Sequence, residues 1–408
     1  MRVSTAQFYL QSAQQMSQKS ADVNEQMEHL SSGKRVLTAK DDAVAYGTLS
    51  GFNNDLANIE KYKRNITMAE NHNSMQEVIF ADAETLLDKI KQDMILANNG
   101  RMSSEDLQAI ADQVRNGLDQ LVDLGNSQNE QGDYIFSGYQ IQQKPFSQQA
   151  DGSVNYNGDT GVNELQVAKN INIATNQTGD AVFLKIANAI GDFKATYDET
   201  NTSGAALASA NVTDRSAYNT SALPHDYTFT FDTITNDLTV TDSSSSIVFP
   251  PPPATSTPYI AGETISFDGI KVALSGNPLP GDNFTMSEQK DISIFETIND
   301  AITWMESGSV SINQEQHQVD YNTLLDQLNS VMNHIYSRRA DAGTRLQVLE
   351  NQQSKHLDVE LNISKGKSSI EDLDFAKAIS EFEQSKIALQ ASQQTFSKVQ
   401  GLSLFNYI

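Results

Sequence analysis

The sequence predicts a mainly α-helical, elongated chain with a β-rich insert in its middle. Three observations support this prediction. The two ends of the 408-residue chain carry narrow apolar stripes with a seven-residue period. Long helical patterns adjoin these stripes, over about residues 44–98 and 319–361. Between them, from about residue 200 to 290, apolar and polar residues alternate as they do in β-strands.

The last stretch, from Glu371 to Ile408, carries the clearer stripe. Ser369, with Asp372 three residues later, predicts a capping box at the start of its helix. A helix with one narrow stripe gains little in water alone, so we expect it to need a partner. The large residues of the stripe are Phe375, Phe382, Leu389 and Phe396, and its small residues are Ala378, Ser385, Ser392 and Val399.

The N-terminal helix offers that partner, because it repeats large residues with the same spacing and has a companion row of Ala13, Ser20 and Met27. Each helix could instead be an ordinary amphipathic helix of a globular protein, but matching stripes at both ends favour a paired coiled coil. We therefore expect a terminal segment from residues 1–44 and 366–408. Its predicted assembly seam consists of Tyr9, Met16, Val23, Leu30, Phe375, Phe382, Leu389, Phe396 and Val399.

The charge of the chain is unevenly distributed. The net charge is −24, yet residues 1–50 hold five basic and five acidic residues, and residues 366–408 hold four and five. The remaining −23 lies in residues 51–365. Neutral ends can pack against copies of themselves, whereas an acidic middle stays hydrated. Without clusters of Lys and Arg, nucleic-acid binding is not expected.

The sequence offers little chemistry. The chain has no cysteine, which excludes disulfides and thiolate nucleophiles. Its six histidines are dispersed, with no His pair at helical ligand spacing. Asn155, Asn157 and Asp159 resemble the start of a calcium loop, but Gln166 stands where the closing Glu is needed. We therefore predict no catalytic residue, cofactor, metal site or enzymatic activity.

The inner helical patterns predict a bundle. The first ends at Asn98-Asn99-Gly100, and Ser103 with Asp106 predicts the capped start of another helix. Together with the helix predicted over residues 319–361, these helices can pack side by side. We assign the bundle, with a β-hairpin region, to residues 45–179 and 291–365.

The middle of the chain predicts strands. Tyr227–Phe231, Leu238–Val240 and Ile265–Phe267 alternate apolar and polar residues between turn residues. Asp180–Thr196 has the spacing of a helix, and the proline run Pro250–Pro253 is typical of a spacer or hairpin loop. We assign residues 180–290 to a β-rich outer domain.

Four short motifs resemble the bacterial flagellin family. They lie in both parts of the predicted terminal segment and in both parts of the predicted bundle, although none falls in residues 200–290. GDYIFSG, followed by Pro145-Phe146, favours the hook-filament junction branch of the family over flagellin itself. The motifs are LSSGKRVLTAKDDA at 30–43, GDYIFSG at 132–138, RRADAGTRL at 338–346 and DLDFA at 372–376.

This resemblance implies a structural axial protein of the flagellum. It implies contacts with hook-associated protein 1, flagellin and copies of the same chain, and a cytoplasmic export chaperone on the C-terminal helix. It also implies terminal helices that order on assembly and export through the flagellar type III channel. Without a visible signal peptide or membrane span, composition favours the cytoplasm; the resemblance replaces this with an extracellular flagellar location. The alternatives are a flagellin and a secreted needle-tip or translocator protein.

Overall fold

The computed structural model describes residues 2–149, 152–198, 200–308 and 313–405; the side chains of residues 2–6, 8 and 399–405 are not described. The chain divides into two compact units. The first consists of Met1–Ile66 and Glu350–Ile408, and the second of Thr67–Leu349. Two long helices, α2 (Ala43–Ala97) and α6 (Gln314–Glu371), contribute to both units.

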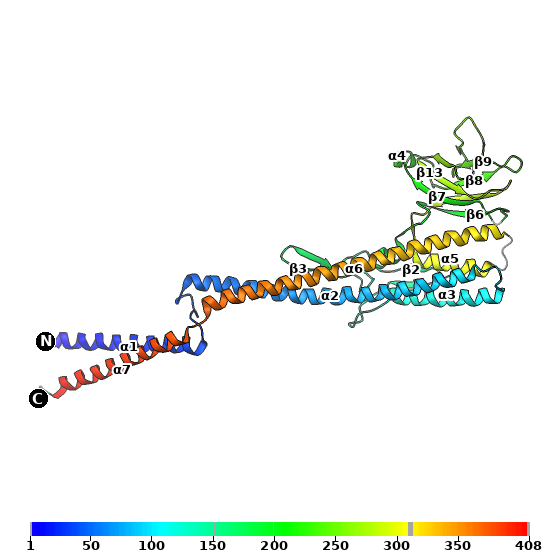
Figure 1. The fold of residues 1–408 in the computed structure, drawn as a ribbon. Coiled ribbons are helices and arrows are strands. Elements are labelled where there is room, and N and C mark those ends of the chain that lie inside the picture. Colours follow the sequence, from blue (N-terminus) through cyan, green and yellow to red (C-terminus); the bar gives the residue numbers. More distant parts are fainter. Residues whose placement is uncertain (1, 150–151, 199, 309–312, 406–408) are drawn as a thin grey trace. The chain divides into compact units, whose positions relative to one another are not determined.

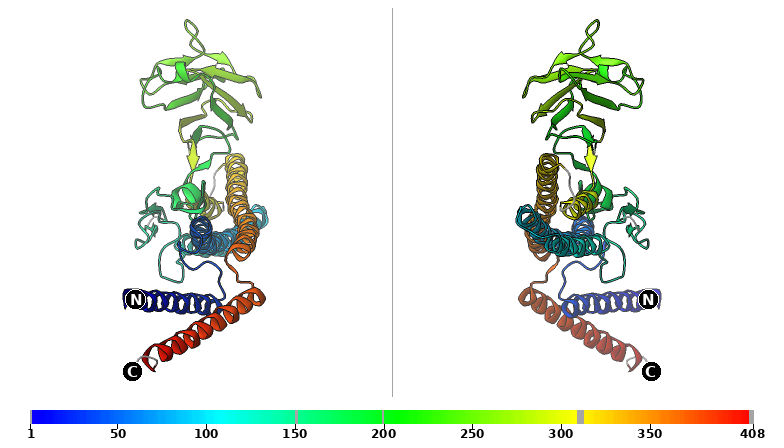
Figure 2. Two further views of the ribbon diagram at one scale, coloured as in Figure 1. Left: turned by 90° about the vertical axis from the view of Figure 1, so that its left-hand side faces the viewer. Right: turned by 90° about the vertical axis from the view of Figure 1, so that its right-hand side faces the viewer.

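The first unit contains the paired ends of the chain. Helices α1 (Arg2–Ser32) and α7 (Phe375–Phe405) lie side by side, as the turned views of Figure 2 also show. The first part of α2 and the last part of α6 complete this unit. The predicted combination of terminal helices with a β-rich middle is confirmed (Figure 1).

The helical part of the second unit packs around an aromatic core. Helices α3 (Ser104–Gly125) and α5 (Ile294–Ser307) join parts of α2 and α6 there. The predicted capping box of Ser103 and Asp106 is present at the start of α3. The buried ring of Phe183 lies between 5.3 and 5.7 Å from those of Phe136, Phe146 and Phe295.

Short antiparallel hairpins follow the helix α3. The first pairs β1 (Phe146–Gln148) with β2 (Val154–Tyr156), and the second pairs β3 (Glu164–Ala168) with β4 (Ile171–Ala174). Both lie within residues 45–179, the range to which the sequence assigns a β-hairpin region. A further short pair links β5 (Ile186–Ala187) to β15 (Asp291–Ile292).

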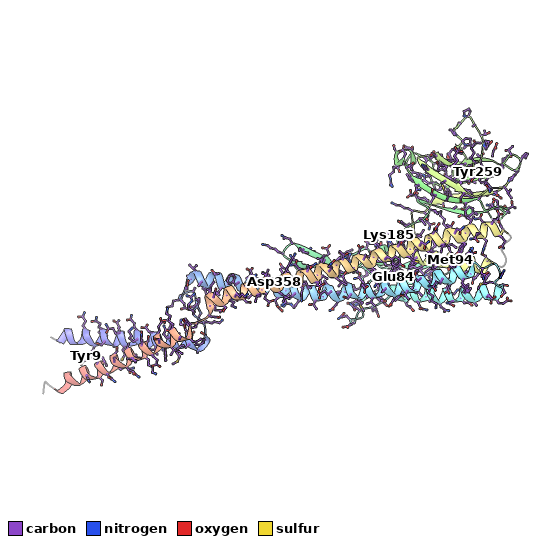
Figure 3. All side chains as sticks on the ribbon, in the orientation of Figure 1. Tyr9, Glu84, Met94, Lys185, Tyr259 and Asp358 are labelled. Carbon is purple, nitrogen blue, oxygen red and sulfur yellow. The ribbon has the colours of Figure 1, made fainter. Side chains whose placement is uncertain are left out.

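The β-rich part of the second unit contains two antiparallel sheets that share one hydrophobic core. One has the strand order β10-β9-β8-β14-β6, with β11 also paired to β9, and the other has the order β12-β13-β7. Tyr259, labelled in Figure 3, packs against this core. The strands are β6 (Phe193–Tyr197), β7 (Ala206–Val212), β8 (Tyr227–Phe231), β9 (Asp237–Thr241), β10 (Ile247–Phe249), β11 (Thr257–Pro258), β12 (Thr264–Phe267), β13 (Ile270–Ser275) and β14 (Asn283–Glu288), and a short helix, α4, spans Arg215–Tyr218.

The helix predicted over residues 180–196 is wrong. The chain forms one short π-helical turn, η1 (Asp180–Leu184), and then continues as β5 and β6. Gly191 has φ of +113°, and a Cβ atom there would lie 2.1 Å from the carbonyl oxygen of Ala210. The Asn188 amide donates to the carbonyl oxygens of Phe193 and Gln289, which holds the bend. The apolar spacing matched a helix because Ile186, Ile190 and Phe193 are buried in this conformation too.

Candidate functional site: the terminal seam

The paired helices α1 and α7 form the candidate site, because they carry the residues that the sequence predicts as an assembly seam. The rings of Tyr9 and Phe396 meet edge to face, with their centroids 6.0 Å apart. Figure 3 labels Tyr9 on α1. This contact joins positions near the two ends of the chain, and both helices belong to the same unit.

The seam is only half closed. On α7, Ala378 is buried, with 3% of its surface exposed, whereas Phe375 is 53% exposed. The structure describes no side chain for Val399. A row of partly exposed apolar side chains can bury more surface against a further partner. The other predicted seam residues are intermediate in burial: Tyr9, Met16, Val23, Leu30, Phe382, Leu389 and Phe396.

The predicted companion row on α1 is wrong. Ala13, Ser20 and Met27 are exposed, and Met27 has 53% of its surface open to solvent. Instead Ser12 and Gln26, three residues after Tyr9 and Val23, are partly buried. Neighbours three and four residues away both lie close to a helical stripe, so a period of seven alone does not select the side that faces the partner.

Backbone hydrogen bonds join the end of α1 to the break between α6 and α7, which we call the base of the seam. Gly33 ends α1 with φ of +69° and accepts a hydrogen bond from the Leu373 amide at 3.0 Å. The Arg35 amide donates to the Glu371 carbonyl at 2.7 Å, and the Lys34 ammonium lies 2.6 Å from the Glu371 carboxylate. The connector after α1 is therefore fixed to the junction between α6 and α7.

The capping box predicted at Ser369 and Asp372 is also wrong, because α6 continues to Glu371. The Ser369 hydroxyl donates back to the Gly366 carbonyl within α6. The Asp374 carboxylate instead accepts a hydrogen bond from the Lys377 amide at 3.1 Å at the start of α7. The short break between the helices lies a few residues later than the sequence pattern suggested.

Two carboxylates organise the connector from α1 to α2. The Asp42 carboxylate accepts a hydrogen bond from the Ala45 amide at the start of α2, and the Asp41 carboxylate accepts from the Leu37 and Thr38 amides. These backbone hydrogen bonds lower the pKa of both carboxyl groups.

Within the described side chains, one group could hold a metal ion: Glu25, His29 and Asp41. The search for His pairs in the sequence missed it, although Glu25 and His29 are four residues apart on one helix.

Comparisons with known proteins place the chain among flagellar proteins. The bacterial flagellin N-terminal helical region matches residues 3–141, and the bacterial flagellin C-terminal helical region matches residues 325–408. The D2-like domain of flagellar hook-associated protein 1 matches residues 196–288. No described helix is long and apolar enough to cross a membrane.

Similar proteins match along most of the chain. Flagellar hook-associated protein 3 of Escherichia coli is 22% identical over 99% of both chains. A crystal structure of flagellar hook-associated protein 3 from Legionella pneumophila is 31% identical, with a TM-score of 0.66, over 79% of this chain and 99% of that one. A Legionella structure described as the flagellar junction protein FlgL has the same identity and TM-score over 80% and 100%.

Flagellin 1 of Proteus mirabilis, by contrast, is 27% identical over only 28% of this chain and 31% of its own. Of these sequence alignments, the one to hook-associated protein 3 therefore spans the chain, whereas the one to flagellin covers less than a third of it. The chain belongs to the flagellar hook-associated protein 3 family, also called FlgL, a family of structural proteins of the bacterial flagellum.

Proposed function

We propose that this protein forms the junction between the hook and the filament of the bacterial flagellum. The half-open seam between α1 and α7 is the observation that supports this role most directly. Besides Phe375, the terminal helices expose Leu10, Ile379 and Ile387. Apolar side chains exposed along a helix pair favour packing against neighbouring subunits. Folding of the seam and assembly of a ring are then one event.

The proposed partners are hook-associated protein 1 on the hook side, flagellin on the filament side, and further copies of the chain. The family likeness supports export through the flagellar type III channel to an extracellular position. Before export, a cytoplasmic chaperone covers the apolar side of α7. Its proposed contact residues are Phe375, Phe382, Leu389, Phe396 and Val399.

We also propose a division of labour along the chain. Residues 1–44 and 366–408 form the assembly core, residues 45–179 and 291–365 form the bundle with its hairpins, and residues 180–290 form the outer domain. The match of residues 196–288 to a separate D2-like domain supports the last of these. A fragment of residues 180–290 that shows cooperative thermal unfolding would support this division, and a disordered one would contradict it.

The junction role can be tested in a strain that lacks the gene. We expect bare hooks by electron microscopy and flagellin shed into the medium, because export continues but the filament has no base. Complementation with Leu389→Asp should fail, since a charge in the half-buried seam opposes packing. Gln390→Asp adds the same charge at an exposed position next to it and should restore filaments. Normal filaments in the deletion strain would overturn the proposal.

Chaperone binding and assembly can be separated by a variant on the other helix. Met16→Asp alters α1 and leaves the proposed chaperone contact on α7 unchanged. We expect this variant to be exported and to bind the chaperone in a pull-down, yet to give no junction. Leu389→Asp should impair both steps. A Met16→Asp variant that loses chaperone binding would contradict a contact confined to α7.

A further inference from the structure

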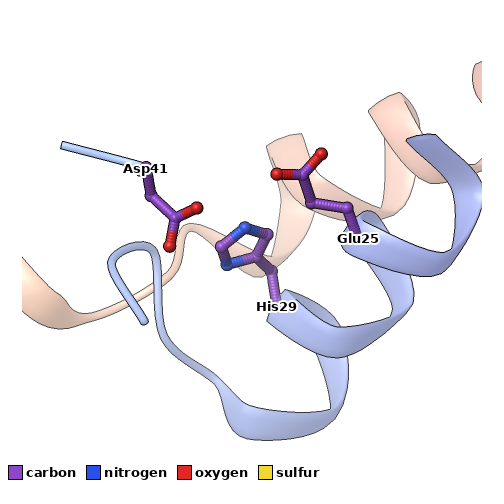
Figure 4. A group of neighbouring side chains, drawn as sticks. All are labelled: Glu25, His29 and Asp41. Carbon is purple, nitrogen blue, oxygen red and sulfur yellow. The ribbon is translucent and has the colours of Figure 1, made fainter. Parts of the chain in front are cut away.

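Three side chains that can bind metals meet where α1 ends and the connector turns back. Glu25 and His29 are four residues apart and share one face of α1, and Asp41 comes from the connector before α2. One potential ligand atom from each lies within 4.8 Å of the others. In Figure 4 the His29 ring lies between the two carboxylates.

The hydrogen bonding of His29 defines which ring nitrogen is free. Its Nδ1 lies 2.9 Å from the carbonyl oxygen of Lys34. A carbonyl oxygen can only accept, so Nδ1 carries the proton and Nε2 keeps a lone pair. A ring nitrogen that donates to a backbone carbonyl is the usual support of a metal-binding histidine, because it fixes the tautomer and the ring orientation.

The two carboxylates are also held while each keeps an oxygen available. Asp41 Oδ2 accepts hydrogen bonds from the Leu37 and Thr38 amides at 2.9 and 2.8 Å, which leaves Oδ1 for a ligand. Glu25 Oε1 lies 3.0 Å from the Lys40 ammonium, and among the described side chains no ion pair involves Oε2. The Lys40 side chain is 80% exposed, so it can move away when another cation binds.

We propose that Glu25, His29 and Asp41 form a binding site for a divalent transition metal, with Zn²⁺ as the reference ion. One imidazole nitrogen and two carboxylate oxygens suit Zn²⁺, whereas Mg²⁺ and Ca²⁺ favour ligand sets made of oxygen. Water completes the coordination. The bound ion ties the connector to the last turns of α1 and so stiffens the base of the terminal seam. The geometry that supports this metal site does not depend on the proposed junction role.

The site should respond in a defined direction when its competing cation is removed. The Lys40 ammonium lies 3.0 Å from the Glu25 carboxylate and competes with the metal ion for it, so Lys40→Ala should strengthen binding. This effect follows from the ligands themselves and requires no change of fold.

Titration of the full-length protein with Zn²⁺ against a chromophoric chelator tests the site. We expect one Zn²⁺ per chain, and binding weakened at least about tenfold in His29→Gln, Glu25→Gln and Asp41→Asn. Glu28→Gln, an exposed neighbour of the same charge, and His72→Gln, a histidine elsewhere on the chain, are the matched controls and should bind as the parent does.

Hydrogen exchange provides a second readout that locates the ion. Amide exchange over residues 25–41 should slow when Zn²⁺ is added to the parent protein, and should not change in His29→Gln. A parent chain that takes up no Zn²⁺, a His29→Gln variant that binds like the parent, or protection that appears elsewhere would each overturn the site. None of these outcomes depends on whether filaments form in cells.

Discussion

The terminal helix pair and the second unit bury their apolar residues in different ways. Among the described side chains of α1 and α7, Ala378 is the one hydrophobic residue that is fully buried. In residues 67–349, by contrast, large aromatic side chains such as Phe80, Phe183 and Tyr227 are almost completely inaccessible. One region is a narrow stripe that remains partly in contact with water, and the other is a filled core.

This difference indicates which region can be stable alone. Burying a large apolar side chain contributes about 1.5–3 kcal/mol, so several buried rings stabilise the second unit from within. The half-exposed seam gains only part of that, and its helices need packing to persist in water. We therefore expect the second unit to be stable by itself. The terminal helix pair should instead need packing against neighbouring subunits to become stable.

The sharpest test of this contrast is Phe183→Ala. Its ring contacts three other buried rings, so we expect a loss of about 3–5 kcal/mol in the free energy of unfolding. Phe375→Ala removes the same side chain from a half-exposed position on α7 and should cost less than about 1 kcal/mol in the free protein. Guanidinium denaturation measures both, and equal losses would show that the seam is as well packed as the core.

Backbone substitutions give a second, smaller contrast. Gly191→Ala forces a side chain into a left-handed conformation against the Ala210 carbonyl and should cost about 1–3 kcal/mol. Gly47→Ala, on α2 in the first unit, meets no atom within 4 Å and should stabilise the helix by up to about 1 kcal/mol. Opposite shifts in Tm are expected, and a stable Gly191→Ala variant would indicate that the bend at β6 can rearrange.

An ion-pair network links helices of the second unit. Arg339 on α6 contacts Glu77 at 2.7 Å and Glu84 at 2.6 Å, both on α2. Arg339→Met should cost about 1 kcal/mol, because two charge-assisted hydrogen bonds are lost at a partly exposed site. Arg64→Met, which removes an exposed pair with Glu60 in the first unit, should have almost no effect. Urea denaturation at low and high salt distinguishes the two.

The smallest expected effect concerns pH. Burial lowers the pKa of His334 below its ordinary value of 6.5, although its bond to the Ala181 carbonyl opposes this. The folded state then binds fewer protons than the unfolded state, so stability present above pH 6.5 is lost as the pH falls toward the lower folded pKa. His334→Gln should reduce the difference in Tm between pH 7.5 and 5.5. An unchanged difference would exclude His334 as the cause.

The terminal seam illustrates what the sequence can predict. A period of seven at both ends pointed to Tyr9 and Phe396, whose rings meet, because periodicity reports the face of a helix directly. It could not choose between Ser12 and Ala13 as the second row, since that choice depends on how the two helices cross. Periodicity also failed at residues 180–196, where Gly191 and Asn188 bend a buried segment into strands.

The cluster of Glu25, His29 and Asp41 was less accessible to sequence reasoning. Two members have helical spacing, which is a signal that an analysis of histidine pairs overlooks. The third, Asp41, reaches the group only because the connector folds back after Gly33 and the Leu37 and Thr38 amides fix its carboxylate. Such a turn depends on hydrogen bonds to Glu371 at the end of α6 and to Leu373 in the break before α7, far away in the chain.

The contact of Tyr9 with Phe396 also constrains the order in which parts of the chain can fold. A chain that emerges N-terminus first, from a ribosome or a narrow channel, releases every residue between α1 and α7 before α7 is free. Local elements such as α3 can form during that interval, whereas a pairing of such high contact order must wait. Until α7 appears, α1 cannot form the contact of Tyr9 with Phe396. Completion of the pair therefore shows that every residue between α1 and α7 has already emerged.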